Sequence, residues 1–328
     1  MVSTKHTDKA SVVVKDKNLI SRLSGLGPVL ALIVLVIITT IMNRNFLDPN
    51  NLLNLLRQVS INGLIAFGMT FVILTGGIDL SVGAILALTS ALSAMMITSG
   101  VPTVIAMVIG IAIGGLLGGV NGLIITKGGA APFIASLATM TIFRGATYVF
   151  TDGNPITGKI MNNSFMFQFI GRGYFFGIPV PVIIMLIAFL ILFILLHKMT
   201  FGRKTYALGG NEKAAFVSGI KVNLTKTWIY VISGIMSSAA GMILISRLSS
   251  AQPDAGTGFE MDAIAAVVLG GTSLAGGRGR LFGTLIGALI IGTLNNGMNL
   301  IGISSFYQQI VKGIVIIIAV LLDRKKNA

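Results

Sequence analysis

The chain has 328 residues, of which 54% are hydrophobic and only 10% are charged, and its mean hydropathy is +0.91. Soluble domains carry about 25% charged residues, so this composition excludes an ordinary soluble enzyme and indicates a protein that lies in lipid. The net charge of +14 would suit a nucleic-acid-binding protein, but the basic residues lie between the apolar stretches, where they set membrane orientation. The absence of cysteine excludes disulfides and thiolate metal sites.

Ten apolar segments predict an all-α, polytopic membrane helix bundle of about ten transmembrane segments, including short or broken helices. The segments are residues 25–42, 52–75, 83–99, 102–126, 131–150, 178–196, 227–246, 262–274, 281–300 and 304–322. The first is interpreted as an uncleaved span, because the polar stretch before it is too long for a signal-peptide n-region. The predicted organisation is a tail at 1–24, a membrane domain at 25–322 with a long connection at 197–226, and a tail at 323–328.

The basic residues also predict the orientation of the chain. Of the 24 Lys and Arg residues, 17 fall in tails and connections on the side of the N-terminus, four fall on the opposite side, and three fall within segments. Positively charged connections stay in the cytoplasm. Both termini and the 197–226 connection are therefore predicted to be cytoplasmic.

Two glycine runs interrupt the apolar pattern. Residues 76–83 read GGIDLSVG, and residues 270–277, which lie 194 positions further along, read GGTSLAGG. Glycine interruptions at corresponding places in two halves of a membrane chain indicate a solute pathway. The pathway is therefore predicted to be lined by Gly76, Gly77, Asp79, Gly270 and Gly271.

The segment at 262–274 is too short to cross a bilayer. Its 13 residues would reach about 20 Å as a helix, whereas the hydrocarbon core is about 30 Å thick. It is predicted to be a half-helix that enters from outside and breaks at Gly270 and Gly271, although a complete span stays open as an alternative. A break at this depth must be buried or line a wet cavity, so we expect no room for a large side chain at Gly271.

Polar side chains within apolar segments are costly and therefore informative. Asn295 and Asn299 lie in the ninth segment, where hydrogen bonding between helices and lining of a hydrophilic path both remain open. Asp79 and Ser81 precede the third segment, and capping of that helix is favoured over a direct transport role for Asp79. Arg144 lies near the outer end of its segment and is expected to extend to the interface.

No catalytic, nucleotide, cofactor or metal site is predicted. Residues 153–160 match a phosphate loop at seven positions but carry Ile160 where Ser or Thr must hold Mg²⁺. Both histidines lie in connections. Proton-coupled carriers usually need several intramembrane carboxylates, which this chain lacks.

Residues 211–219 predict a short helix within the cytoplasmic connection. Asn211 is a good N-cap, Glu212 favours the positive end of the helix dipole, and Gly219 can adopt the left-handed conformation that ends a helix. About two turns are too short to be stable alone, yet they present Ala214, Ala215 and Phe216. Docking onto a cytoplasmic partner is favoured over a solvated connector.

Residues 248–277 above all, together with 76–83 and 211–220, resemble the membrane permeases of bacterial monosaccharide ABC importers, in particular those of ribose importers. The resemblance covers about residues 45–326. It implies a homodimer of permease subunits in the bacterial cytoplasmic membrane, an ATP-binding cassette subunit that hydrolyses ATP, an extracytoplasmic sugar-binding protein, and ribose or a related monosaccharide as substrate. Ala214, Ala215 and Gly219 match the coupling loop of such permeases, whereas Glu212 lies one position early.

Two other functions remain open at this stage. The chain could be a stand-alone facilitator or secondary carrier for a small hydrophilic solute, or an intramembrane enzyme. The first would transport without an ATP-hydrolysing partner, and the second would alter its substrate chemically.

Overall fold

The computed structural model describes residues 27–158, 161 and 163–327, and side chains up to residue 321. The predicted tail at 1–24 and the last two residues of the 153–160 motif lie outside the described residues. The helices are α2 (Gly27–Met42), η1 (Arg44–Leu47), α3 (Pro49–Leu74), α4 (Val82–Thr98), α5 (Thr103–Thr126), α6 (Pro132–Thr151), α8 (Phe165–Arg172), α9 (Val180–His197), α10 (Thr200–Gly210), α11 (Glu212–Val217), α12 (Val222–Leu248), α13 (Phe259–Leu269), α14 (Leu281–Leu300) and α15 (Ser305–Asn327). A two-stranded antiparallel hairpin, β1 (Tyr174–Phe175) with β2 (Ile178–Pro179), precedes α9.

The all-α fold is confirmed, and every one of the predicted apolar segments overlaps a helix. Among the described residues, six helices are long and apolar enough to cross a membrane, namely α3, α5, α6, α9, α12 and α14. The apolar parts of α2, α4 and α15 are shorter, and α13 has only 11 residues. The structure therefore establishes a polytopic bundle, while the number of complete spans stays a prediction.

The helices α3 and α12 form the centre of the bundle and are buried along most of their length. The helices α5 and α12 approach closely because glycines face each other. A Cβ atom at Gly118 would overlap the Tyr230 carbonyl oxygen, and one at Gly234 would overlap the Gly114 carbonyl oxygen. The glycines of α5 therefore form a packing surface that brings two backbones together.

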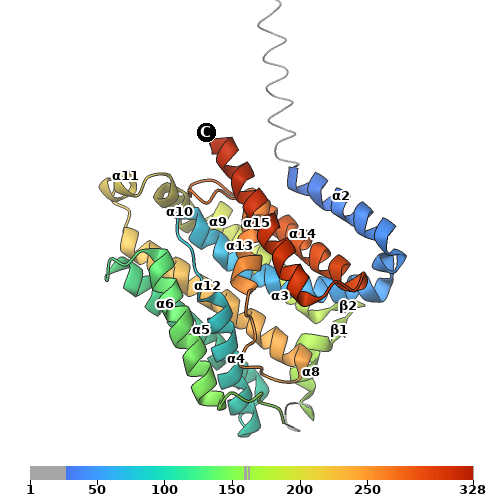
Figure 1. The fold of residues 1–328 in the computed structure, drawn as a ribbon. Coiled ribbons are helices and arrows are strands. Elements are labelled where there is room, and N and C mark those ends of the chain that lie inside the picture. The colour runs from blue at the N-terminus through green and yellow to red at the C-terminus, as the bar shows by residue number, and fades with distance from the viewer. Residues whose placement is uncertain (1–26, 159–160, 162, 328) are drawn as a thin grey trace, which may run out of the picture.

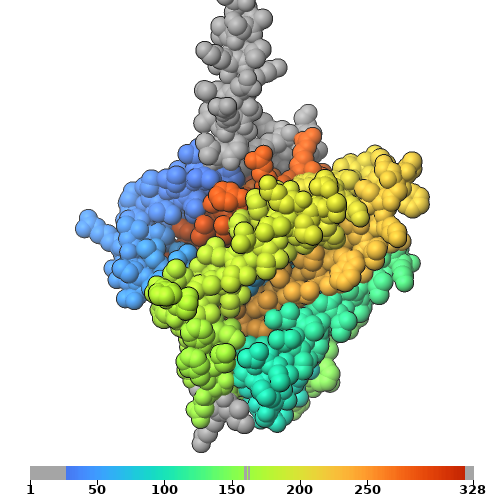
Figure 2. All heavy atoms as spheres, turned by 180° about the vertical axis from the view of Figure 1, so that it is seen from behind, coloured from blue at the N-terminus to red at the C-terminus, as the bar shows by residue number. Residues whose placement is uncertain are grey.

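The outward faces of the peripheral helices are apolar, as helices in contact with lipid require. Exposed Val, Leu, Ile and Phe side chains cover α2, α5, α6 and α9. Figure 2 shows α9 and α12 as diagonal bands across the back of the molecule, with α5 below them. This exposure identifies a lipid-facing surface around the bundle.

The beginning of α2, the end of α15 and the α10–α11 segment lie at the same end of the bundle, at the top of Figure 1. The helix α8 and the β1–β2 hairpin lie toward the other end. This arrangement agrees with an even number of crossings between the two ends of the described chain. Assignment of that end to the cytoplasm is still based on the distribution of basic residues.

The connection predicted at 197–226 is more structured than its composition indicates. The helix α10 occupies its first half, and α12 begins at Val222, five residues before the predicted start at 227. Both segments are polar in sequence, so an apolar pattern does not reveal them. Tertiary packing stabilises them, because Thr205, Leu208 and Val222 are buried.

We expect Gly118→Ala and Gly234→Ala each to destabilise the α5–α12 contact by about 1–3 kcal/mol, because each added methyl group would overlap a backbone carbonyl. Thermal unfolding in detergent would measure the loss. Gly145→Ala in α6 is the matched control, since a Cβ atom there meets nothing within 4 Å. Equal melting temperatures for all three variants would contradict this packing.

Candidate functional site

The short helix predicted at residues 211–219 is confirmed as α11, with Asn211 as its N-cap and Gly219 just beyond its end. The Asn211 Oδ1 atom accepts a hydrogen bond from the Ala214 amide at 2.9 Å, and Gly219 has a φ of +82°, which favours glycine. Ala215 faces inward against Leu208 of α10 and Val222 of α12. Because α11 has only six residues, this packing and capping hold it in place.

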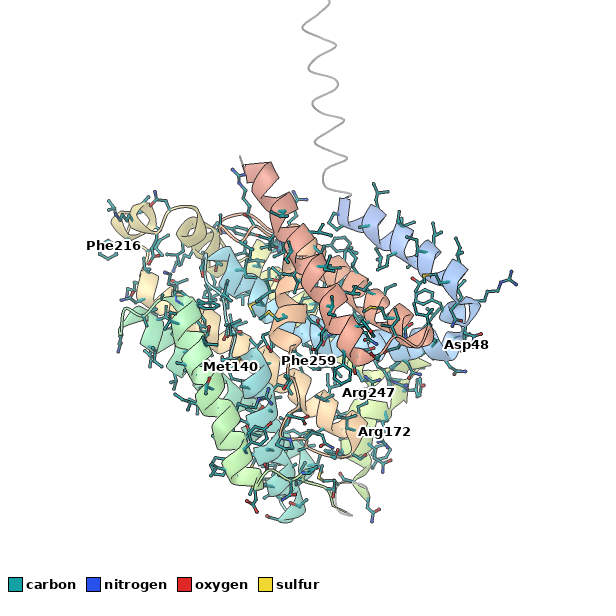
Figure 3. The ribbon with its side chains drawn as sticks, viewed as in Figure 1. Asp48, Met140, Arg172, Phe216, Arg247 and Phe259 are labelled. Carbon is teal, nitrogen blue, oxygen red and sulfur yellow. The ribbon has the colours of Figure 1, made fainter. Side chains whose placement is uncertain are left out.

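The C-terminal end of α11 exposes two large apolar side chains. Phe216 is 70% exposed and Val217 is 85% exposed, and Phe216 projects at the edge of the molecule in Figure 3. An open surface hollow lies beside them, lined by Glu212, Lys213, Phe216, Val217, Val222 and Asn223. The Glu212 carboxylate forms an ion pair with Lys226 Nζ at 2.7 Å, which the sequence analysis missed because the two residues belong to different helices.

The structure brings the two glycine runs together. The Gly277 amide donates a hydrogen bond to the Leu74 carbonyl oxygen at 2.9 Å, and Leu74 is the last residue of α3. A Cβ atom at Gly276 would lie 3.0 Å from the Gly76 nitrogen. The runs are 194 residues apart in sequence but form one junction in space.

The four predicted pathway glycines occupy different environments at this junction. Gly76 and Gly271 are exposed and have φ values of +75° and +87°. Gly77 is buried beside the Tyr230 hydroxyl, and Gly270 packs against the backbone of Gly283 in α14. A Cβ atom at Gly271 meets nothing within 4 Å, so no atom crowds the start of a side chain there; the positive φ of the residue is what restricts it.

The short helices α4 and α13 begin next to each other. A Cβ atom at Gly83 would overlap the Gly256 carbonyl oxygen and would lie 2.8 Å from a Glu260 carboxylate oxygen. Phe259, the first residue of α13, lies at mid-height of the bundle in Figure 3, level with Met140 of α6. Both positive helix ends therefore point into the interior, an arrangement found where discontinuous helices bind solutes.

The helix α13 is short and ends before Gly270, as predicted. Residues 249–258 fold inward ahead of it, so that α13 begins within the bundle, and its entry from outside stays a prediction. Gly256 and Gly258 have φ values of +73° and +84°, and Arg144 Nη1 donates to the carbonyl oxygens of Pro253 at 2.9 Å and Ala255 at 2.7 Å. The expected extension of Arg144 to the membrane interface is thus wrong, because these carbonyls satisfy it inside the protein.

Asp79 is fully buried and joins several helices. Its carboxylate accepts hydrogen bonds from the Ser81 hydroxyl at 2.6 Å, from the Ser233 hydroxyl of α12 at 2.8 Å and, at 3.4 Å, from Asn121 Nδ2 of α5. Thr139 of α6 donates to Asn121 Oδ1 at 2.6 Å. Ser81 is the N-cap of α4 but its side chain makes no capping bond, so the capping prediction is wrong for Ser81. The Asp79 carboxylate also accepts a hydrogen bond from the Ser81 backbone amide at 3.1 Å.

A second polar cluster joins α13, α14 and α15. Lys312 Nζ lies 2.9 Å from a carboxylate oxygen of Asp262, and the Asp262 side chain is only 4% exposed. Asn295 Nδ2 donates to the same carboxylate at 3.5 Å, and its Oδ1 atom is buried without a hydrogen-bond partner. One turn along α14, Asn299 Oδ1 accepts a hydrogen bond from Gln308 Nε2 of α15 at 2.8 Å.

The predicted pathway residues therefore separate into three groups: the glycine junction, the buried network of Asp79, and the polar face of α14 with Asn295 and Asn299. Sequence analysis missed Asn121, Thr139 and Ser233 as partners of Asp79. Their only signal is the presence of hydrogen-bonding side chains in the middle of apolar segments. No group of three or more His, Cys, Asp or Glu residues that could hold a metal occurs among the described residues.

Comparisons with known proteins agree with this architecture. A family model described as "Branched-chain amino acid transport system / permease component" matches residues 51–320. The chain belongs to this family of permeases. No solved structure matches it.

Among its relatives, the ribose import permease protein RbsC of Bacillus subtilis is 71% identical over 303 residues, which cover 92% of this chain and 94% of the relative. The D-allose transport system permease protein AlsC of Escherichia coli is 46% identical over 295 residues, 89% of either chain. The L-arabinose transport system permease protein AraH of Escherichia coli is 41% identical over 301 residues, which cover 92% of this chain and 90% of the relative. The chain is therefore an integral, multi-pass transport subunit, which favours the permease interpretation over a stand-alone carrier.

We expect Lys312→Met to lower the stability of the protein in detergent by about 3–5 kcal/mol, because it leaves the buried Asp262 carboxylate without its cation. The double variant Asp262→Asn with Lys312→Met removes both charges and should recover most of that loss. Chemical denaturation of the single and double variants would measure the difference. A double variant as unstable as the single one would contradict a role for the unpaired charge.

Proposed function

We propose that the chain is the permease subunit of an ATP-driven importer that carries ribose or a related monosaccharide across the bacterial cytoplasmic membrane. The extent and level of its similarity to a ribose import permease support the substrate. The docking helix α11, with its exposed apolar end, is the structural observation that carries the proposal.

An ATP-binding cassette subunit is the proposed partner of α11. Phe216 and Val217 are large apolar side chains beside a surface hollow on an otherwise polar segment. Burial of such a pair in a partner groove would supply the anchor that a short helix lacks. The coupling residues would be Asn211, Glu212, Ala214, Ala215, Phe216 and Gly219, and this chain would need no cofactor of its own.

A second permease copy and an extracytoplasmic sugar-binding protein complete the proposed assembly. The solute path would run between the two copies, along the glycine junction and the polar face of α14. Asn295 and Asn299 support this path, because amide groups in a membrane helix can exchange hydrogen bonds with sugar hydroxyls. ATP-driven movement of the partner would displace α11 and rock the helices around this path. Asp79 would hold α4, α5, α6 and α12 together as they move.

Uptake of labelled ribose into sealed vesicles tests the proposal. We expect uptake only when the chain is combined with its ATP-binding subunit, a ribose-binding protein and ATP. Uptake by the chain alone would indicate a facilitator, and a chemically altered product would indicate an enzyme. Competition by allose and arabinose would rank the related sugars.

Phe216→Asp should reduce binding of the ATP-binding subunit at least about tenfold, because it places a charge in an apolar anchor. Co-purification and ATP-dependent ribose uptake would measure the effect. Met199→Asp is the matched control, since Met199 is 50% exposed and precedes α10 outside α11. Normal co-purification of the Phe216→Asp variant would reject α11 as the anchor.

A further inference from the structure

The helix α10, which leads directly into α11, is in backbone contact with the second glycine run and with Leu74, which lies two residues before the first run. Gly209 lies one residue before the end of α10. A Cβ atom at Gly209 would overlap the Leu74 carbonyl oxygen and the Gly277 amide nitrogen, and these two atoms are hydrogen-bonded to each other at 2.9 Å. Only glycine can occupy this position without displacing the end of α3 or the second run.

The second glycine run is shaped to fit this contact. Gly276 and Gly277 have φ values of +84° and +72°, a region that residues with a Cβ atom rarely adopt. A Cβ atom at Gly276 would lie 3.0 Å from the Gly209 carbonyl oxygen, and one at Gly277 would lie 3.0 Å from the Gly210 nitrogen. Three stretches of backbone therefore meet with no side chain between them, and such close packing transmits displacement rather than absorbing it.

A side-chain hydrogen bond fixes α10 to the residues that directly follow the second run. Tyr206 lies three residues before Gly209, and its Oη atom donates to the Gly279 carbonyl oxygen at 2.8 Å. Burial raises the pKa of Tyr206 above its usual value, so the hydroxyl keeps its proton at physiological pH. Two residues of α10, Tyr206 and Gly209, therefore hold it against the segment that contains Gly277 and Gly279.

The other end of this attachment is the docking helix itself. Asn211 is both the C-cap of α10 and the N-cap of α11, so the two helices share one residue. Ala215 of α11 packs against Leu208 of α10. A displacement of α11 therefore moves α10 with it.

We propose that Gly209, Gly277 and the Leu74 carbonyl form a joint that transmits movement of α11 to both glycine runs, with Tyr206 as a positioning residue. This inference depends on the proposed function, since it concerns the coupling of ATP hydrolysis to sugar movement. The coupling would then depend on a contact that lies outside α11, between α10, the end of α3 and the second glycine run.

The test compares Gly209→Ala with Gly210→Ala in the complete importer, reconstituted with its ATP-binding subunit and ribose-binding protein. The two glycines are neighbours in α10, but a Cβ atom at Gly210 meets nothing within 4 Å. The readout is the amount of ribose transported per ATP hydrolysed, alongside co-purification of the ATP-binding subunit. Loss of folded protein alone would lower transport and hydrolysis together and leave their ratio unchanged.

We expect Gly209→Ala to retain the ATP-binding subunit but to transport about tenfold less ribose per ATP, within the usual range of coupling between sites. The Gly210→Ala variant should transport as much ribose per ATP as the unmodified protein. Tyr206→Phe, which removes one hydrogen bond and no packing volume, should lower the ratio about threefold.

Equal ratios for Gly209→Ala and Gly210→Ala would overturn the joint. If Gly209→Ala does not fold, the Tyr206→Phe variant tests the proposal instead. An unchanged amount of ribose transported per ATP in that variant would also overturn the proposal. Absence of ATP-dependent ribose uptake by the unmodified assembly would instead reject the proposed function.

Discussion

Close approach of backbones through glycine is the constraint on which the rest of this structure depends. The hydrogen bond of Gly277 to Leu74 joins the second glycine run to the end of α3, next to the first run, and Gly118 and Gly234 bring α5 against α12. In lipid, hydrophobic burial does not drive helices together, so van der Waals packing and hydrogen bonds must do so. Glycine permits both, because it lets main-chain atoms of different helices touch.

The second constraint is the cost of polar groups in an apolar medium. The carboxylates of Asp79 and Asp262 are both almost fully buried, yet their environments differ. Hydroxyl and amide groups surround Asp79, whereas Lys312 neutralises Asp262. Each carboxylate connects helices that are distant in sequence, so the polar groups fix the arrangement of the bundle as well as serving the proposed path.

Sequence analysis predicted the helices well because apolar length and glycine breaks are local signals. It located α11, its Asn211 cap and its Gly219 end, since capping follows from residue type within a few positions. It missed α10 and misjudged Arg144, because both depend on groups far away in the chain. Thr205 and Leu208 become buried only when α10 meets the bundle, and Arg144 finds its carbonyls 109 and 111 residues further on.

The sequence by itself determined a helical membrane protein, the position of the short helix α11 and the two glycine runs, because periodicity, charge and capping depend on residues that are close together in the chain. Only the tertiary structure decided that the two runs meet, that α4 and α13 begin side by side, and that Gly209 contacts the junction. Those contacts join main-chain atoms at large sequence separations. A glycine in a sequence shows that a close approach is permitted, but not which backbone will make it.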